Sequence, residues 1–270
     1  MRLNEAILAL SSAGIDNARA EAREIFMRIG GYPISELISR DPDTLCPAVI
    51  SAVERRQKRE PLQYIIGEVG FFKETYTVSP DCLIPRADTE ITVELAIKLL
   101  PAGGRILDLC TGSGCIAIST VKNTKDTTAV AVDISEGAIA VARANSKKNG
   151  CDDRIEFLVR DVFSFEPNEK FDLILSNPPY VTEEEYRSLE PELYFEPRLA
   201  LVGEDNGLRF YKHIASAYKS CLSPTGAIIF EIGHLQRESL FEIAEQFGYE
   251  AEVHTDYGGR DRVIILRNKK

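Results

Sequence analysis

The spacing of apolar positions along the chain changes near residue 62. Before that point, apolar residues recur every three or four positions in three segments: Leu3 to Leu10, Ala18 to Ile29 and Val49 to Arg56. This period is typical of amphipathic helices. Gly30-Gly31 and Pro33 are signals that end the second segment. We therefore predict a small helical domain over residues 1–62.

Residues 63–80 have a different composition, Q-Y-I-I-G-E-V-G-F-F-K-E-T-Y-T-V-S-P. They are rich in β-branched and aromatic residues and contain Gly67 and Gly70, a pattern typical of a short β-hairpin. We predict a hairpin linker over residues 63–85.

From residue 86 onward, short apolar runs alternate with amphipathic segments. The predicted strands are Arg105–Leu109, Ala129–Asp133, Ile155–Val159, Phe171–Leu175, Ala227–Ile232, Glu252–Tyr257 and Arg262–Leu266. The predicted helices are Cys115–Lys122, Glu136–Lys148, Leu208–Cys221 and Glu238–Phe247. This alternation predicts an α/β domain over residues 86–270, Rossmann-like, with a mostly parallel sheet of seven strands and helices on both faces. Only Gly258-Gly259 and a few polar residues separate the last two strands, so we expect them to pair as an antiparallel hairpin at the edge of the sheet.

Composition limits the possible partners. The formal net charge is −10, from 32 Lys plus Arg against 42 Asp plus Glu, which disfavours duplex nucleic acid as the principal partner. The six cysteines form no C-x-x-C pair, and we find no signal peptide or long apolar span, so we expect reduced thiols, a cytoplasmic location and no membrane contact. The three histidines lack metal-ligand spacing, so no metal is predicted.

A glycine-rich turn follows the first predicted strand, in I-L-D-L-C-T-G-S-G-C-I-A over residues 106–117. Gly112 and Gly114 let the backbone turn sharply near a ligand, and the following helix offers free N–H groups. Together with Ala117 they match the dinucleotide fingerprint, and Asp133, 19 residues after Gly114, is placed to hold ribose hydroxyls. This pattern alone fits a nicotinamide enzyme as well as an S-adenosylmethionine enzyme.

Three acidic residues at strand ends help to distinguish between these candidate ligands. Asp108 would repel a pyrophosphate but suits the ammonium and sulfonium groups of adenosylmethionine, unless it only caps the turn. Asp133 could instead belong to a helix N-cap with Ser135. Asp161 is placed to accept from an adenine amine with Val162 packed on the ring, although a solvated loop would explain Asp161 equally well.

The fourth predicted strand ends in S-N-P-P-Y, residues 176–180. Pro178 and Pro179 hold the chain extended and leave the Pro178 carbonyl available as an acceptor. The side-chain oxygen of Asn177 is a second acceptor, and two fixed acceptors match the two hydrogens of a planar –NH2 group. Tyr180 would provide a flat wall beside that group. The alternative is a turn that simply ends a strand.

The motifs D-L-C-T-G-S-G, V-A-V-D, R-D-V-F and N-P-P-Y, in this order, make the chain similar to class I methyltransferases that act on amino nitrogens. Three further stretches narrow the resemblance: L-I-P-R-A-D-T-E at 83–90, F-E-P-R-L-A-L at 195–201 and R-D-R-V at 260–263. With these, nearly the whole chain resembles the bacterial peptide chain release factor glutamine methyltransferases.

The resemblance implies a reaction and its partners. This family transfers a methyl group from S-adenosyl-L-methionine to the glutamine side-chain amide in the Gly-Gly-Gln loop of class 1 release factors, leaving S-adenosyl-L-homocysteine. Residues 1–62 would then be a substrate-binding domain that grips the release factor, and residues 86–270 the catalytic domain. We expect a monomer that binds no nucleic acid directly.

The resemblance also assigns roles to residues. The cofactor would be bound by Asp108, Thr111, Gly112, Ser113, Gly114, Asp133, Asp161, Val162 and Asn177. The substrate glutamine would be bound by Asn177, Pro178, Pro179 and Tyr180, with Asn177, Pro178 and Tyr180 as the catalytic set. Cys110 replaces the first glycine of the wider methyltransferase turn. Arg86, Thr89 and Glu90 are expected near the pocket mouth, and residues 181–206 as a flap on the substrate side.

Three other functions are compatible with parts of the pattern. An adenine methyltransferase acting on DNA or RNA could use N-P-P-Y on a flipped base, but it would need a basic recognition region that the sequence does not show. A Rossmann module kept only for binding is disfavoured by the intact Asn177 and Asp133. A nicotinamide oxidoreductase is disfavoured by Asp108 and by the reversed terminal strand.

Overall fold

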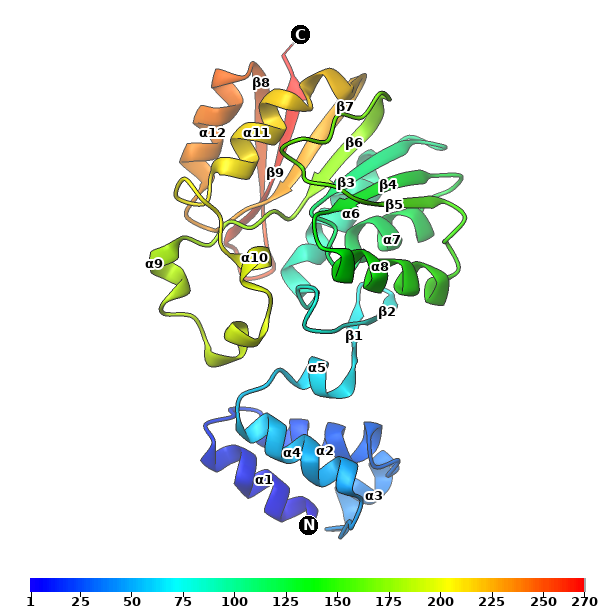
Figure 1. Ribbon diagram of the computed structural model, residues 1–270, viewed down its shortest axis with the longest axis vertical. Coiled ribbons are helices and arrows are strands. Elements are labelled where there is room, and N and C mark those ends of the chain that lie inside the picture. The colour runs from blue at the N-terminus through cyan, green and yellow to red at the C-terminus, as the bar shows by residue number, and fades with distance from the viewer. Residues whose placement is uncertain (270) are drawn as a thin grey trace. The chain divides into compact units, whose positions relative to one another are not determined.

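The computed structural model describes residues 1–269, which divide into two compact units (Figure 1). The first unit contains Met1–Glu68 together with Glu190–Phe195. The second contains the other described residues, Val69–Leu189 and those from Glu196 onward. Each unit has a core of its own, so each is described separately.

The first unit is helical. Its elements are α1 (Leu3–Ser12), α2 (Ala18–Arg28), α3 (Ile34–Ser39), α4 (Pro47–Gln57), α5 (Leu62–Ile66) and the 3-10 helix η2 (Pro191–Phe195). Leu10, Ile25, Phe26 and Val53 are fully buried at its centre. Arg56, also buried, pairs with Glu21 at 2.5 Å and with Glu192 at 2.8 Å, which holds residues 190–195 on this unit.

The predicted hairpin begins later in the structure than the sequence indicated. Residues 62–66 form the short helix α5, which ends at Gly67 with φ +85°, a left-handed conformation favourable only for glycine. The hairpin consists of β1 (Glu68–Phe71) and β2 (Glu74–Thr77). The run Q-Y-I-I misled the prediction because α5, with five residues, is too short to show a helical period.

Within residues 1–269, the second unit contains a seven-stranded sheet in the order β5-β4-β3-β6-β7-β9-β8. The strands are β3 (Arg105–Leu109), β4 (Thr128–Asp133), β5 (Ile155–Val159), β6 (Phe171–Ser176), β7 (Leu222–Glu231), β8 (Tyr249–Thr255) and β9 (Asp261–Asn268). Neighbours from β5 to β7 run parallel, whereas β9 is antiparallel to both β7 and β8. The predicted fold class is thus confirmed, with the reversed strand β9 lying between β7 and the edge strand β8.

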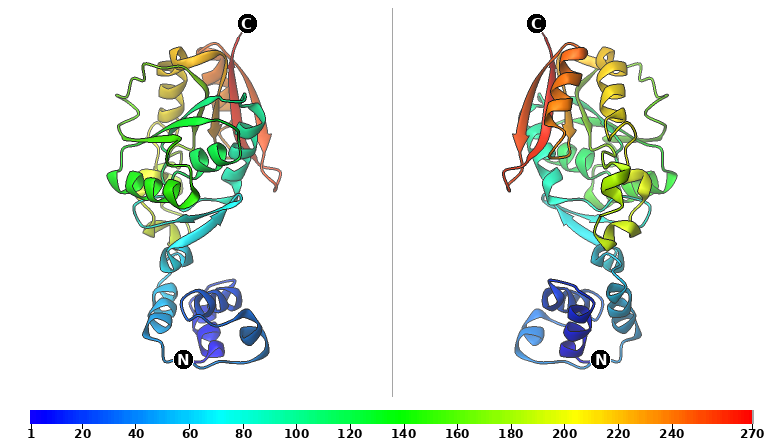
Figure 2. Two further views of the ribbon diagram at one scale, coloured as in Figure 1. Left: turned by 90° about the vertical axis from the view of Figure 1, so that its right-hand side faces the viewer. Right: turned by 90° about the vertical axis from the view of Figure 1, so that its left-hand side faces the viewer.

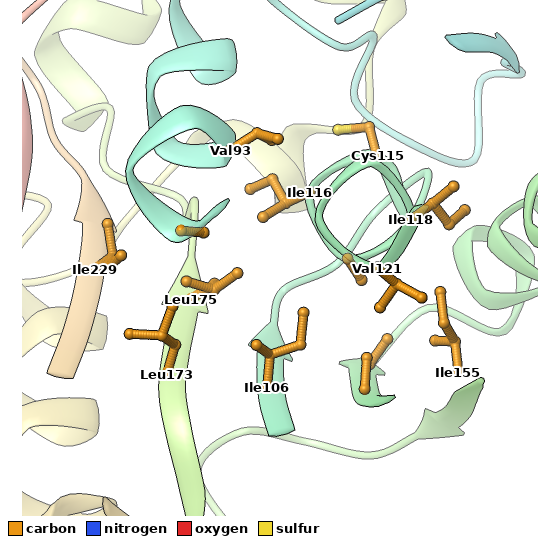
Figure 3. Close-up of a cluster of buried hydrophobic side chains, with 14 of the residues drawn as sticks. Val93, Ile106, Cys115, Ile116, Ile118, Val121, Ile155, Leu173, Leu175 and Ile229 are labelled. Carbon is orange, nitrogen blue, oxygen red and sulfur yellow. The ribbon is translucent and has the colours of Figure 1, made fainter. Parts of the chain in front are cut away.

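Helices cover both faces of this sheet (Figures 1 and 2). One face packs against α6 (Glu90–Leu99), α7 (Cys115–Lys122) and α8 (Glu136–Asn149), and the other against α11 (Arg209–Ala217) and α12 (Arg237–Gln246). Figure 3 shows the first of these layers, where Ile106, Leu173 and Ile229 of three strands face the helical side chains. Leu107 and Leu109 point into the opposite layer. Because both faces are buried, the central strands are almost wholly apolar.

Short elements complete the second unit: η1 (Ala87–Thr89), α9 (Glu183–Tyr186), α10 (Arg198–Leu201) and η3 (Lys219–Cys221). Residues 181–206, for which no regular structure was predicted, therefore contain α9, η2 and α10. No helix of residues 1–269 has both the length and the apolar character required to cross a bilayer.

Candidate active site

A cavity of about 320 Å³ lies in the second unit, at the carboxyl ends of the parallel strands β3, β4 and β6. Strand β3 has β4 on one side and β6 on the other, and a crevice at such a switch in strand order is the usual ligand site of these folds. Predicted site residues that line the cavity are Thr111, Gly112, Ser113, Asp133, Asp161, Val162, Asn177 and Pro179. Four other predicted site residues are not among the described residues that line the cavity: Asp108, Gly114, Pro178 and Tyr180.

Asp108 lies beneath the turn and is fully buried. Its Oδ2 accepts hydrogen bonds from the Thr111 hydroxyl at 2.6 Å and from the Ala117 N–H at 3.3 Å. Its Oδ1 has no hydrogen-bond partner among the described residues. The carboxyl therefore holds the turn against α7, as in the capping alternative, and contacts the cavity-wall residue Thr111.

Burial raises the pKa of Asp108 to about 7 from 3.8, against the lowering effect of the hydrogen bond from Thr111. Since the folded-state pKa lies above the unfolded one, the contribution of Asp108 to stability is complete below about pH 4 and is lost as pH rises through about 7. We expect the unfolding free energy of the native chain, minus that of Asp108→Asn, to fall by up to about 4 kcal/mol over this range. Urea unfolding of both proteins without added cofactor measures this difference in unfolding free energy. A difference that stays constant across the pH range would show that the Asp108 carboxyl titrates normally.

The two glycines of the turn serve different purposes. Gly112 has φ +55°, and a Cβ there would meet no protein atom within 4 Å, so it would project into open space at the cavity wall. At Gly114, with φ +81°, a Cβ would lie 2.9 Å from Ile118 and 3.1 Å from Ala142. Gly112 thus leaves room for a ligand, whereas Gly114 allows α7 and α8 to pack closely. Cys110 adopts φ +63° where the wider motif has glycine, a conformation that costs a non-glycine residue about 1 kcal/mol.

Asp133 ends β4 and lines the cavity. Its Oδ2 accepts from the Gly112 N–H at 2.8 Å and its Oδ1 from the Ser135 N–H at 3.0 Å. Each oxygen keeps the capacity to accept a second hydrogen bond, which matches a pair of neighbouring ribose hydroxyls. Burial raises the pKa of this carboxyl, while its backbone hydrogen bonds lower it. Asp133 therefore holds the turn and keeps acceptor capacity that would suit ribose hydroxyls.

Part of the cavity lining, after β5 and at the start of α11, is aromatic. Asp161 accepts from the Phe163 N–H at 2.9 Å, and Phe163 packs on Phe210 with ring centroids 4.8 Å apart. The Arg209 guanidinium lies 4.2 Å from the Phe163 ring centroid. These side chains suit a flat heteroaromatic ring with a hydrogen-bonding edge. Sequence reasoning missed Arg209 and Phe210, because α11 lies far from Asp161 along the chain.

Asn177 is connected to a buried polar network behind the cavity wall. Its Nδ2 donates to the Thr89 hydroxyl at 3.5 Å, and that hydroxyl donates to Glu231 Oε2 at 2.6 Å. The Tyr180 hydroxyl donates to Glu231 Oε1 at 3.2 Å, so Tyr180 directs its polar end to this network. Burial raises the pKa of Glu231, although the hydrogen bond from Thr89 and the charge of Arg262 lower it. Sequence reasoning missed Glu231; its signal is a lone carboxyl ending the apolar strand β7.

Arg86 and Glu90 lie on either side of η1. Arg86 lines the cavity and pairs with the buried Glu196, which also accepts from the Ile84 N–H at 3.0 Å. Glu90 accepts from the Phe72 N–H at 2.7 Å, so its side chain holds the β1–β2 turn. Of the three residues expected at the pocket mouth, Arg86 and Thr89 are at the cavity and Glu90 has a structural contact.

These features fit S-adenosyl-L-methionine. The open space at Gly112, the acceptors of Asp133 and the aromatic side chains beside Asp161 follow the adjacent strands β3, β4 and β5 and line one cavity, an order that matches methionine, ribose and adenine. No group of three His, Cys, Asp or Glu side chains within residues 1–269 is arranged to hold a metal ion.

Comparisons with known proteins agree with this geometry. Residues 87–193 match the family model of the methyltransferase small domain, and residues 2–67 match that of the PrmC N-terminal domain. The release factor glutamine methyltransferase of Thermodesulfovibrio yellowstonii is 40% identical over 93% of this chain and 92% of its own length. A bifunctional methyltransferase of Rickettsia typhi is 36% identical over 98% of this chain, which spans only 56% of that larger relative.

A solved structure resembles the second unit. The crystal structure of a methyltransferase from Pyrococcus furiosus aligns with a TM-score of 0.55 at 18% identity, covering 72% of this chain and 89% of that one. At this identity the likeness shows the fold alone.

Proposed function

Since the chain belongs to the release factor glutamine methyltransferase family, we propose that it methylates the side-chain amide nitrogen of the glutamine in the Gly-Gly-Gln motif of class 1 peptide chain release factors. The methyl donor is S-adenosyl-L-methionine, and S-adenosyl-L-homocysteine is the product. The single observation that supports this proposal most is the position of Asn177 on the wall of the cavity that Gly112 and Asp133 also line.

The proposed mechanism depends on orientation. Asn177 Oδ1 and the Pro178 carbonyl accept the two hydrogens of the substrate amide and hold its nitrogen toward the cavity. When bound, the cofactor supplies an electrophilic methyl group on a sulfonium. The acceptor pair becomes more favourable as positive charge develops on the substrate nitrogen, so these residues stabilise the transition state more than the ground state. The extra proton can leave to solvent afterwards, so no strong base is required.

The helical unit has a separate role in the proposal. Residues 1–62 bind the release factor, while residues 63–85 link this unit to the catalytic residues 86–270. The match of residues 2–67 to a family model of their own supports treating them as a separate module. The compact units of the structure divide at nearly the same place, at Glu68.

Methyl transfer from labelled cofactor tests the proposal. The acceptors would be a release factor purified in unmethylated form, the same factor with its Gly-Gly-Gln glutamine changed to alanine, and unmethylated DNA. We expect one methyl group per molecule of the native factor and none in the alanine variant or in DNA. Label in DNA adenine instead would support the alternative adenine methyltransferase, since the same two acceptors fit an adenine amine. Equal label in both release factors would exclude the proposed target.

A further inference from the structure

At the cavity wall, Thr89 and Glu231 form a buried hydrogen-bonded pair, which we name the orienting pair. Thr89 ends η1 and lines the cavity, whereas Glu231 ends β7 and is not among the described residues that line it. Each residue is 2% exposed. Their contact, Thr89 Oγ1 to Glu231 Oε2 at 2.6 Å, joins segments 142 residues apart in sequence.

The direction of this hydrogen bond determines how Asn177 faces Thr89. A hydroxyl has one proton, and the Glu231 carboxylate can only accept, so the Thr89 proton is committed to Glu231. The Thr89 oxygen then offers only lone pairs to Asn177. The Asn177 Nδ2, at 3.5 Å, can donate to it, whereas Oδ1 in the same place would face another electron-rich oxygen.

We propose that Thr89 and Glu231 are positioning residues that fix the Asn177 amide with Oδ1 toward the substrate. This inference rests on the proposed methyl transfer, because the substrate amide needs an acceptor at that point. If the amide were reversed, an –NH2 group would face the –NH2 group of the substrate, and no hydrogen bond would form. The 3.5 Å contact is long, so its role is to select one orientation of the amide rather than to contribute much binding energy.

The surroundings of Glu231 hold it in place. Its Oε1 accepts from the Tyr180 hydroxyl at 3.2 Å, and its backbone carbonyl accepts from the Tyr211 hydroxyl at 2.8 Å. Arg262, whose charge favours the Glu231 carboxylate, pairs with Asp88 at 3.3 Å and with Asp256 at 3.4 Å. Because Asp88 precedes Thr89, Arg262 ties η1 to the β8–β9 turn.

These contacts connect two sequence motifs that lie outside the glycine-rich turn. The stretch L-I-P-R-A-D-T-E supplies Asp88 and Thr89, and R-D-R-V supplies Arg262. The two motifs lie 170 residues or more apart in the chain yet meet through the Arg262–Asp88 ion pair. In this account, both serve the orientation of Asn177.

The test compares Thr89→Val, which keeps the shape but removes the hydroxyl, with Thr89→Ser, which keeps the hydroxyl. We expect Thr89→Val to lower kcat by roughly 10- to 100-fold, because misplaced reacting groups lose about this much rate. The KM for release factor, the Kd for S-adenosyl-L-homocysteine and the Tm should change little. Thr89→Ser should recover most of the lost rate.

Thr92→Val provides a matched control. Thr92 lies one turn further along α6, is fully buried, and its hydroxyl has no hydrogen-bond partner among the described residues. This variant should keep the native kcat. Full activity in Thr89→Val would overturn the proposal. A loss of kcat in Thr89→Val would also overturn it if Thr89→Ser did not restore the rate, or if the loss accompanied a lower Tm.

A second measurement does not depend on activity. The protein is labelled with ¹⁵N-asparagine, and the Asn177 side-chain signal is identified by its absence in Asn177→Ala. In the native protein and in Thr92→Val, one Nδ2 proton of Asn177 should be protected from exchange with solvent. In Thr89→Val, this protection should be lost. Equal protection in all three would contradict the orienting pair. If native enzyme transferred no methyl group to release factor while this protection pattern held, the proposed function would fail and the orienting pair would stand.

Discussion

Asn177→Ala is expected to lower the rate of methyl transfer to release factor by about 100-fold or more, the usual cost of losing one preorganised hydrogen-bonding group that acts in the transition state. The substrate amide would lose one of its two acceptors, and its nitrogen would no longer be held toward the cofactor. Binding of S-adenosyl-L-homocysteine should change little, because Asp133, Asp161 and the Gly112 turn are intact. Single-turnover kinetics and calorimetric titration measure the two quantities.

The matched control for this variant is Asn168→Ala, in the exposed loop before β6. It removes the same side chain from the same unit and should transfer methyl groups at the native rate. Native turnover in Asn177→Ala would contradict the mechanism. A parallel loss of cofactor affinity in Asn177→Ala would mean that Asn177 serves the cofactor rather than the substrate.

Asp133→Ala is expected to weaken cofactor binding on the order of 100-fold or more. Two hydrogen bonds from ribose hydroxyls to a carboxylate would be lost, each contributing roughly 1.5–3 kcal/mol. The variant also leaves the N–H groups of Gly112 and Ser135 without their acceptor, which loosens the turn. Titration with S-adenosyl-L-homocysteine measures the change in Kd.

Asp153→Ala is the corresponding control, because Asp153 is an exposed acid in the turn before β5. It changes the net charge equally and should bind the cofactor with native affinity. If Asp133→Ala bound as tightly as Asp153→Ala, the ribose assignment would be wrong. A circular dichroism melt of both variants separates a local loss of binding from unfolding.

The sequence predicted the elements with a strong period and missed the short ones. Arg105–Leu109, Ile155–Val159 and Cys115–Lys122 have the predicted bounds in the structure, because a buried strand and an apolar helix of eight residues leave clear patterns. The six-residue α3, with Leu37 as its buried residue, has too few positions to show a period. For the same reason α5 was predicted to be part of a strand.

The candidate site was predictable where function lies in a local motif. Gly112, Asp133, Asp161 and Asn177 each lie at or just after the carboxyl end of a parallel strand, so strand order alone brings them together. Spacing does not determine which side of a loop faces the ligand. Hence Asp108 and Gly114, both in the motif, hold the turn and the helix packing instead of lining the cavity.

The rest of the site depends on contacts between distant segments. Glu231 reaches Thr89 from β7, and Arg209 reaches Phe163 from α11. No local pattern connects these residues, because the parallel sheet places them together only after its crossover helices have packed. Tyr180, three residues after Asn177 in the sequence, also makes a contact with a distant segment, because its hydroxyl donates to Glu231.

A crystal structure with S-adenosyl-L-homocysteine and a peptide containing Gly-Gly-Gln would test the central claim most directly. The account predicts the sulfur in the cavity beside Gly112 and the glutamine amide nitrogen about 3 Å from both Asn177 Oδ1 and the Pro178 carbonyl oxygen. A glutamine side chain bound away from Asn177, or a sulfur on the far side of the cavity from it, would contradict the account.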